Sequence, residues 1–196
     1  MKYNGVILSG TPGAGKSVLA QKLIEAYNWE KLSLGDYWKK AYKIAHPTKD
    51  IDFASFWRST SREENQRINR EAREALKIRS IVCDSRYTAA YCQDLPLLLV
   101  YLNAPIETRA YRLLGSNLYA GMDVSQVAAK LVEREDDEVR RGKEFFGEPY
   151  DYRNATWYDL ILNSNTHSIE DEFKIIQERL SSTLFLPRLM ENVHLN

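Results

Sequence analysis

Residues 10–17 read Gly-Thr-Pro-Gly-Ala-Gly-Lys-Ser and match the phosphate-binding pattern G-x-x-x-x-G-K-[ST] at every fixed position. An apolar run that contains Val6-Ile7-Leu8 comes before this loop, and an amphipathic stretch over 16–27 follows it. The pattern therefore predicts a buried strand over 3–9, then the loop, then a helix over 16–27, which is the context that the motif needs. A unit of this kind is typical of a parallel sheet covered by helices.

The residue types in the loop suit the binding of phosphate. Its glycines allow consecutive backbone N–H groups to point inward, and the following helix adds its positive N-terminal end. Lys16 has the length to reach the β- and γ-phosphates, while the Ser17 hydroxyl is a ligand for Mg²⁺. Pro12 has no N–H group and adds no donor. We expect ATP to contact the whole loop, which consists of Gly10, Thr11, Pro12, Gly13, Ala14, Gly15, Lys16 and Ser17. The alternative, a glycine-rich turn without a ligand, does not require this spacing or this context.

Short apolar runs alternate with longer amphipathic stretches along the rest of the chain. The runs at 3–9, 30–33, 79–84, 97–102 and 158–162 predict five strands. The alternation predicts an α/β fold with three layers, in which a five-stranded parallel sheet is flanked by helices. The length of 196 residues fits one domain over residues 1–196.

Two long segments interrupt this alternation. Residues 35–78 carry only helical signals and predict a small helical insert between the second and third strands. Residues 116–150 are dense in charges of both signs, which indicates an exposed helix rather than disorder. The tail over 184–196 has little periodicity, and we expect an appendage there.

The charge balance narrows the range of partners. The chain has 27 Lys+Arg and 27 Asp+Glu, and this zero balance argues against a dedicated nucleic-acid binder, although it allows a local cluster of arginines around a phosphate. Neither a secretory signal nor a run of about 20 apolar residues is visible, so we expect a cytoplasmic protein without a membrane partner. Cys83 and Cys92 are too few for a disulfide scaffold, and we expect them to be apolar filler in a reducing compartment.

The loop alone does not identify the acceptor, because GTPases, ATPases and small-molecule kinases share it. No Asn-Lys-x-Asp motif for reading guanine is present, and the length with two inserts favours a compact kinase. Further motifs follow the loop in order: Leu32-Ser33-Leu34-Gly35-Asp36, Asp84-Ser85-Arg86, Ala104 to Arg112, Arg134 to Arg141, Tyr150-Asp151 and Tyr158 to Asn163. Over residues 4–183, this ordered set resembles the nucleoside monophosphate kinase family of P-loop kinases, and most of all its archaeal-type cytidylate kinases.

The resemblance implies a P-loop NTPase fold in which residues 35–78 bind the acceptor monophosphate and residues 116–150 form a lid. It implies Mg²⁺ with ATP as donor, small-molecule substrates, and a monomer or weak homodimer. The implied catalytic residues are Lys16, Arg86, Arg134 and Arg140, and the implied further ATP contacts are Val18 and Arg112. The implied acceptor-binding residues are Ser33, Gly35, Lys39, Asn69, Asp84 and Arg86, with Ser17 and, as an outer ligand, Asp84 at the metal.

Several of these residues have a simpler interpretation. Asp84 ends a buried strand and is either linked to the metal and Arg86 or the N-cap of a helix that starts near Tyr87. Arg86 follows the same strand, where ligands of parallel sheets collect, and its alternative is a surface salt bridge. For Arg134 and Arg140 the alternative is a solvated helix face, although we expect at least one lid arginine at the transferring phosphate.

The chain departs from the family at four positions: Lys39 replaces an arginine, Asn65 and Asn69 stand where the family has aspartates, and Ser116 replaces a further arginine. Asn65 and Asn69 lie four apart on an expected helix and share a face. Because an Asn amide both donates and accepts, it suits cytosine and uracil, so we expect CMP or dCMP as best acceptor with UMP usable. The alternative is that both asparagines are solvated.

Two other functions remain open from the sequence. One is a different small-molecule P-loop kinase, similar to adenylate kinase or to dephospho-coenzyme-A kinase. The other is a nucleotide-binding regulatory protein without turnover, which the four departures keep possible. Six aromatic residues also crowd the expected insert and either form its small core or stack on the acceptor base; they are Tyr37, Trp38, Tyr42, Phe53, Phe56 and Trp57.

Overall fold

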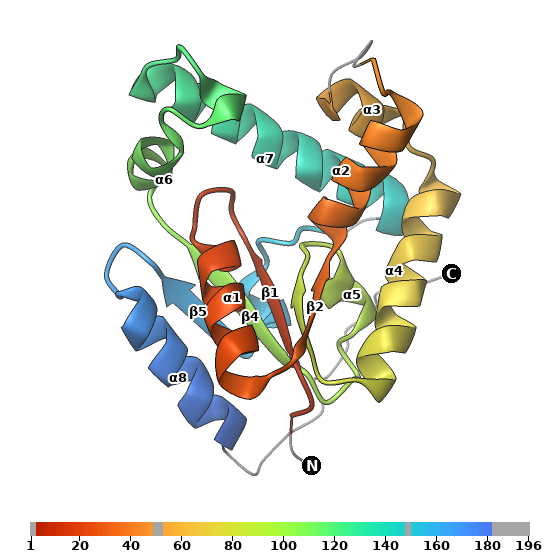
Figure 1. The fold of residues 1–196 in the computed structure, drawn as a ribbon, viewed down its shortest axis with the longest axis vertical. Helices are drawn as coiled ribbons and strands as arrows, with labels where there is room; N and C mark the ends of the chain where they lie inside the picture. The colour runs from red at the N-terminus through yellow and green to blue at the C-terminus, as the bar shows by residue number, and fades with distance from the viewer. Residues whose placement is uncertain (1–2, 49–52, 148–149, 182–196) are drawn as a thin grey trace.

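The fold is a parallel sheet with helices on both faces (Figure 1). The computed structural model describes residues 3–48, 53–147 and 150–181, so the appendage expected at 184–196 lies outside the described residues. The strands are β1 (Val6–Gly10), β2 (Glu30–Ser33), β3 (Ile81–Asp84), β4 (Leu98–Asn103) and β5 (Leu160–Asn163), and they lie in the order β2-β3-β1-β4-β5. All four strand pairs are parallel, which confirms the five-stranded parallel sheet.

Alternate side chains of the strands build a separate core on each face of the sheet. On one face, Val6 and Leu8 pack with residues of α1 (Lys16–Tyr27) and α8 (Ile169–Ser181). On the other face, Ile7 packs with residues of α5 (Thr88–Tyr91) and of the C-terminal half of a long helix, α7 (Val124–Phe146). Both faces are therefore covered, which explains why the strands are apolar almost throughout.

The segment between β2 and β3 is helical, as its sequence predicts. It contains α2 (Leu34–Ala45), α3 (Phe53–Ser59) and α4 (Arg62–Ile78). Leu34, Trp38, Ile68 and Ala72 form its own buried cluster, against which Phe56 and Trp57 pack. The core interpretation of the aromatic residues is confirmed for Trp38, Phe56 and Trp57, whereas Tyr37 is exposed.

The charged segment after β4 is mostly one long helix. After α6 (Ile106–Leu113) and a short 3₁₀ turn at Asn117–Tyr119, α7 runs for 23 residues, and a second 3₁₀ turn at Ala155–Trp157 precedes β5. A capping box fixes the start of α7, since the Asp123 side chain accepts from the Gln126 amide and the Gln126 side chain accepts from the Asp123 amide. In Figure 1, α7 lies across the top of the molecule, above the edge of the sheet where β1 ends.

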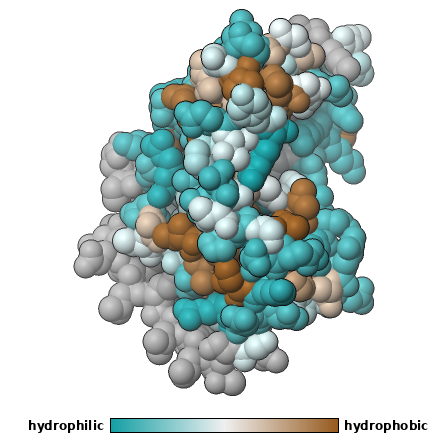
Figure 2. All heavy atoms as spheres, turned by 90° about the vertical axis from the view of Figure 1, so that its left-hand side faces the viewer, coloured by the Kyte–Doolittle hydropathy of each residue, from teal (hydrophilic) through white to brown (hydrophobic). Residues whose placement is uncertain are grey.

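Among the described residues, no helix has the length and the apolar character needed to cross a membrane. Figure 2 shows that the face on the left of Figure 1 is hydrophilic over most of its area, with hydrophobic side chains in small separate groups. Cys83 and Cys92 are both buried and form no disulfide with each other, as apolar filler would not. Burial raises the pKa of the Cys83 thiol well above its ordinary value, which keeps the thiol protonated.

One buried acid makes the stability of the fold depend on pH. Glu172 of α8 is 1% exposed, and its Oε1 has no hydrogen-bond partner within the part of the chain that the structure describes. Burial raises its pKa to about 7 from the ordinary 4.5, and His167 and Arg112 offset the rise only in part. Because the unfolded chain ionises at a lower pH than the folded one, the free energy of unfolding falls as the pH rises from about 4.5 to about 7.

We expect a Glu172→Gln substitution to remove this pH-dependent loss. The unfolding free energy of the variant relative to the unsubstituted protein should increase by about 1–3 kcal/mol between pH 5 and pH 8, measured by urea denaturation. The matched control is Glu178→Gln on the exposed face of the same helix, which should not change the pH dependence. Equal pH dependence in the unsubstituted protein and in Glu172→Gln would show that this carboxyl is not responsible.

Candidate active site

The loop between β1 and α1 has the backbone of an anion-binding nest. Gly10, Gly13 and Gly15 have φ angles of 135°, 79° and 95°, which only glycine adopts without strain. A Cβ atom on Gly10 would also collide with the backbone carbonyl of Leu102. Within the described ranges, the amides of Gly13, Gly15, Lys16 and Ser17 make no hydrogen bond to a protein acceptor. The donors that a phosphate group needs are therefore available.

Contacts on the outside of the loop hold its carbonyl groups away from these amides. Arg109 of α6 donates from Nη1 to the carbonyl of Pro12 at 3.2 Å, and Arg112 donates from Nη1 to the carbonyl of Gly13 at 3.4 Å. The Thr11 hydroxyl donates to Oδ1 of Asn103 at the end of β4 at 3.0 Å. Helix α6 and strand β4 thus fix the orientation of the loop peptides.

Lys16 lies within the loop and is 8% exposed. Its Nζ donates to the carbonyls of Gly10 and Thr11 at 2.9 and 2.8 Å. Burial, together with the positive charge of Arg86, lowers the pKa of Lys16 to about 7, while Asp84 raises it in part. A cation that is this poorly solvated gains more from a phosphate oxygen than an exposed lysine does.

Ser17 and Asp84 lie together, as the sequence predicts for a magnesium site. The Ser17 hydroxyl donates to Oδ2 of Asp84 at 3.3 Å, across from α1 to the end of β3. Asp84 does not have the alternative role of a helix N-cap. The amide of Thr88 donates instead to the hydroxyl of the neighbouring Ser85, at 3.2 Å. A hydroxyl beside one carboxylate fits Mg²⁺, which in kinases takes its other ligands from water and phosphates.

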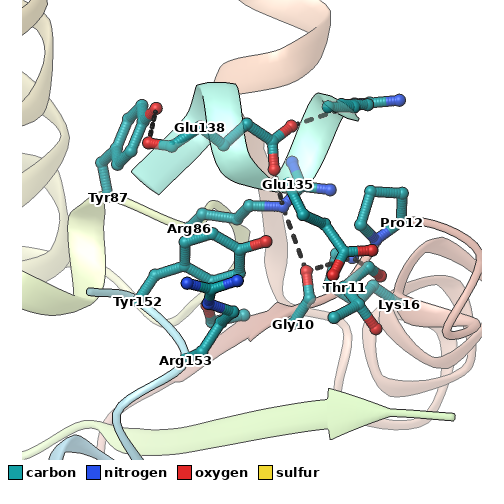
Figure 3. A network of polar contacts seen from close by, with 12 residues as sticks. Gly10, Thr11, Pro12, Lys16, Arg86, Tyr87, Glu135, Glu138, Tyr152 and Arg153 are labelled. Atoms are coloured by element: carbon teal, nitrogen blue, oxygen red, sulfur yellow. Dashed lines mark hydrogen bonds and ion pairs between the residues drawn. The ribbon is translucent and has the colours of Figure 1, made fainter. Parts of the chain in front are cut away.

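Arg86 lies between the loop and α7. Its Nε donates to the carbonyl of Gly10 at 3.1 Å and lies 3.0 Å from Oε2 of Glu138 on α7 (Figure 3). Its guanidinium lies 5.9 Å from the centre of the Tyr152 ring. Burial alone would lower the pKa of Arg86, but Glu138 together with Tyr152, Asp84 and Tyr87 outweighs burial and holds the pKa above its ordinary value. The surface salt-bridge alternative is therefore wrong for Arg86, because the pair is 19% and 11% exposed.

The two arginines expected from the lid lie on different faces of α7. Arg134 donates from Nε to Oε1 of Glu138 at 3.0 Å and so joins the same group of charges as Arg86. Arg140 is 56% exposed and pairs with Asp137 and Glu144, and none of its contacts reaches the loop. The structure therefore brings together Lys16, Arg86 and Arg134, and it does not bring Arg140 to them.

The residues expected at the start of the acceptor lobe surround the first turn of α2. Ser33 caps the helix by accepting from the amide of Asp36 at 3.2 Å, and the space around Gly35 is open. Lys39 is 65% exposed and lies 3.4 Å from Asp36. None of the contacts of Lys39 reaches Arg86 in this structure.

The two asparagines of α4 are buried, so the solvated alternative is wrong. Asn69 donates to the carbonyl of Asn65 at 2.8 Å and accepts from the Thr88 hydroxyl at 3.1 Å. Asn65 donates to the Thr60 hydroxyl and to the carbonyl of Ser61 at 2.8 and 2.9 Å. Its Oδ1 is buried without a hydrogen-bond partner among the described residues. The unpartnered acceptor therefore belongs to Asn65 rather than to Asn69.

On the donor side, Arg112 links the loop to the end of β5. Besides Gly13, it contacts the hydroxyl and the carbonyl of Ser164 at 2.7 and 2.8 Å. Val18 is 63% exposed beside the loop in the first turn of α1. Both positions border the loop, and contact of either residue with ATP stays a prediction.

The sequence reasoning missed the acids that organise these cations. Glu135 forms a buried ion pair with Arg109, and Glu138 pairs with Arg86 and Arg134. Figure 3 shows both acids pointing from α7 toward the loop. The mixed charges of residues 133–141 indicated an exposed helix. The one signal of a buried side was the spacing of Glu135 and Glu138, which places both acids on one face of the helix.

The chain is similar to known kinases in sequence and in fold. No protein-family model matches the chain. The chain is 27% identical to the cytidylate kinase of Methanopyrus kandleri over 91% of this chain and 94% of the relative, and 28% identical to that of Aeropyrum pernix over 88% and 96%. Among solved structures, shikimate kinase from Bacteroides thetaiotaomicron superposes with a TM-score of 0.59 at 15% identity, over 91% of this chain and 98% of that one.

The solved structures establish the fold alone, and they confirm the P-loop kinase architecture. The sequence relatives extend over about nine tenths of both chains, so the resemblance to the archaeal cytidylate kinases holds for the whole arrangement and not only for the loop. The chain thus has the P-loop kinase fold, and over most of its length it is similar to cytidylate kinases, which are phosphotransferases of the nucleoside monophosphate kinase type.

Proposed function

We propose that the chain uses ATP with Mg²⁺ to phosphorylate a pyrimidine nucleoside monophosphate, with CMP or dCMP as best acceptor. The observation that carries this proposal is the facing arrangement of the loop and the arginines. The loop supplies Lys16 and four amides that have no protein acceptor among the described residues, and Arg86 with Arg134 lies between the loop and α7. The names of the sequence relatives support cytidine as the nucleoside.

Transfer of a phosphoryl group needs alignment and charge stabilisation more than a protein base. The loop amides and Lys16 would hold the β- and γ-phosphates of ATP, and Arg86 would hold the acceptor phosphate in line with them. Arg134 would stabilise the charge that spreads over the transferring oxygens. Ser17 and Asp84 would hold Mg²⁺, which when bound neutralises charge on the donor phosphates.

We propose further that α7 is the lid and that α2, α3 and α4 form the acceptor lobe. The two parts touch directly, since Arg58 of α3 pairs with Asp137 of α7 at 2.6 Å, and Arg141 of α7 donates to the carbonyl of Thr60 at 2.8 Å. These contacts would couple binding of the acceptor to placement of Arg134. A closed lid also excludes water, which would otherwise hydrolyse ATP.

Product analysis with ATP, Mg²⁺ and a panel of nucleoside monophosphates tests the function. We expect CDP or dCDP as the main product, UDP as a minor product and little ADP from AMP. Preference for AMP, or turnover only with dephospho-coenzyme A, would identify one of the other small-molecule kinases. No turnover with any acceptor would favour a nucleotide-binding regulatory protein.

The buried Oδ1 of Asn65 leads to a prediction about the base. This acceptor suits the amino group of cytosine. A carboxylate at the same position would accept more strongly from that amino group and would repel the carbonyl oxygen of uracil. We expect Asn65→Asp to raise the ratio of kcat/KM for CMP over UMP by about five- to tenfold. In Asn69→Asp the ratio should change less, since both ends of the Asn69 amide are already bonded.

The ratio is the right measurement because any fraction of misfolded enzyme cancels from it. Asn154→Asp is the matched control, since Asn154 is an exposed N-cap and aspartate caps equally well. An unchanged ratio in both Asn65→Asp and Asn69→Asp would exclude these residues from base recognition.

A further inference from the structure

The Glu138 carboxylate contacts Arg86 and Arg134, the cations that the proposed function assigns to phosphate groups. Its Oε2 lies 3.0 Å from Nε of Arg86, and its Oε1 accepts from Nε of Arg134 at 3.0 Å. Its side chain is 11% exposed, so water screens these charges poorly. Lys16 also lies within range of this carboxylate, which acts to raise the pKa of the lysine.

The contact with Arg86 leaves hydrogen-bonding capacity unused on both partners. Oε2 of Glu138 is buried and has no hydrogen-bond partner among the described residues, because Arg86 Nε directs its hydrogen to the carbonyl of Gly10 instead. The terminal Nη1 and Nη2 groups of Arg86 donate to no acceptor in the described part of the chain. The ring of Tyr152 lies under the Arg86 guanidinium, and the Tyr152 hydroxyl is likewise buried without a hydrogen-bond partner among the described residues. Arg86 is therefore neutralised by Glu138 but keeps its fork free for an oxyanion.

The backbone of Glu138 is held in place independently of its side chain. The Tyr87 hydroxyl donates to the carbonyl of Glu138 at 2.9 Å (Figure 3). Tyr87 is itself packed in the core beside Phe145 and Tyr150. Tyr87, which follows Arg86 after β3, thus holds in place the turn of α7 that carries the Glu138 carboxylate. A surface carboxylate that met Arg86 by chance would not need this second anchor.

We propose that Glu138 is a built-in counter-ion that occupies the charge of Arg86 and Arg134 and competes with phosphate groups for it. A phosphate that binds the Arg86 fork brings its negative charge within a few ångströms of Glu138, so binding must overcome that repulsion or turn the carboxylate away. Glu138 thereby lowers the affinity for any phosphorylated ligand. Its charge also offsets the repulsion between the clustered cations and so stabilises the folded protein. This inference rests on the proposed function, since it takes the loop and Arg86 to be a phosphate site.

The test compares Glu138→Gln with the unsubstituted protein in the binding of pyrophosphate, measured by titration calorimetry at fixed salt. Glutamine keeps the shape and still accepts from Arg134 but carries no charge. We expect pyrophosphate to bind roughly tenfold more tightly to the variant, with a smaller gain for inorganic phosphate and none for cytidine, which carries no charge. The gain should shrink as salt is added, because screening weakens a charge effect.

Two further variants keep the result specific. Glu133→Gln removes the same charge from the exposed side of α7, where Glu133 pairs with Lys130 at 2.7 Å and lies 3.9 Å from Arg58, and it should leave the affinity unchanged. Glu138→Asp keeps the charge and should bind pyrophosphate no more tightly than the unsubstituted protein, even if its folding is weakened. Circular dichroism confirms that each variant is folded before titration.

The outcomes separate this inference from the proposed function. Weaker or unchanged binding of pyrophosphate by Glu138→Gln, with clear binding by the unsubstituted protein, would overturn the counter-ion role and leave the kinase proposal intact. A gain of equal size in Glu133→Gln would also overturn it, because the effect would then come from net charge alone. Failure of the unsubstituted protein to bind either pyrophosphate or ATP would overturn both.

Discussion

A Lys16→Ala substitution should reduce kcat by at least about a hundredfold while the protein stays folded. Lys16 is the only lysine of the loop, and its Nζ donates to the carbonyls of Gly10 and Thr11. Removal of Nζ removes the charge that offsets the β- and γ-phosphates during transfer. The measurement is steady-state kinetics with ATP and CMP, together with the ATP dissociation constant from titration.

The fold should survive this change because opposing effects nearly cancel. The variant loses two hydrogen bonds to backbone carbonyls, but it also loses a buried cation whose pKa burial has lowered to about 7. We therefore expect the free energy of unfolding to change by about 1 kcal/mol or less. Lys22→Ala is the control on the same helix, since Lys22 pairs with Glu170 on α8 and has no contact with the loop. Near-normal turnover by Lys16→Ala would remove Lys16 from the mechanism.

The part of the fold that local sequence determines was predictable. The helix expected at 16–27 and the strand expected at 30–33 have those bounds in the structure. The helix begins after Gly15 and ends before Asn28, both of which have positive φ, so local backbone chemistry sets its limits. The strand expected at 3–9 instead begins at Val6, because its bounds depend on pairing with β3 and β4.

The two acids that α7 brings to the candidate site were not predictable, because their partners are distant in sequence. Glu138 meets Arg86 across 52 residues, and nothing near either residue marks the pairing. The charged appearance of α7 hides a buried side, since Glu135 and Glu138 are each 8% exposed. In the same way the sequence left open whether Asn65 is solvated, whereas the structure buries it beside Thr60. The loop motif was recognisable because it makes its site with its own backbone.

An Arg86→Ala substitution should weaken binding of the acceptor roughly 10- to 100-fold and binding of ATP much less. The charge of Arg86 lies beyond Gly10, on the side of the loop that faces α7, and its terminal amino groups are free to hold an oxyanion. Loss of a buried, charge-assisted contact of this kind typically costs ~1.5–3 kcal/mol. Separate titrations with CMP and with ATP measure the two effects.

Among the described residues, the same substitution also leaves Arg134 as the one remaining ion-pair partner of the buried Glu138, which would destabilise the fold as well as the site. The double variant Arg86→Ala/Glu138→Gln separates these consequences, because it removes the uncompensated carboxylate. Its unfolding free energy should recover toward that of the unsubstituted protein, whereas its affinity for CMP should stay low. Equal weakening of CMP and ATP in the double variant would mean that Arg86 is no acceptor ligand, and recovery of CMP binding there would mean that the single variant acted only through the stranded charge of Glu138.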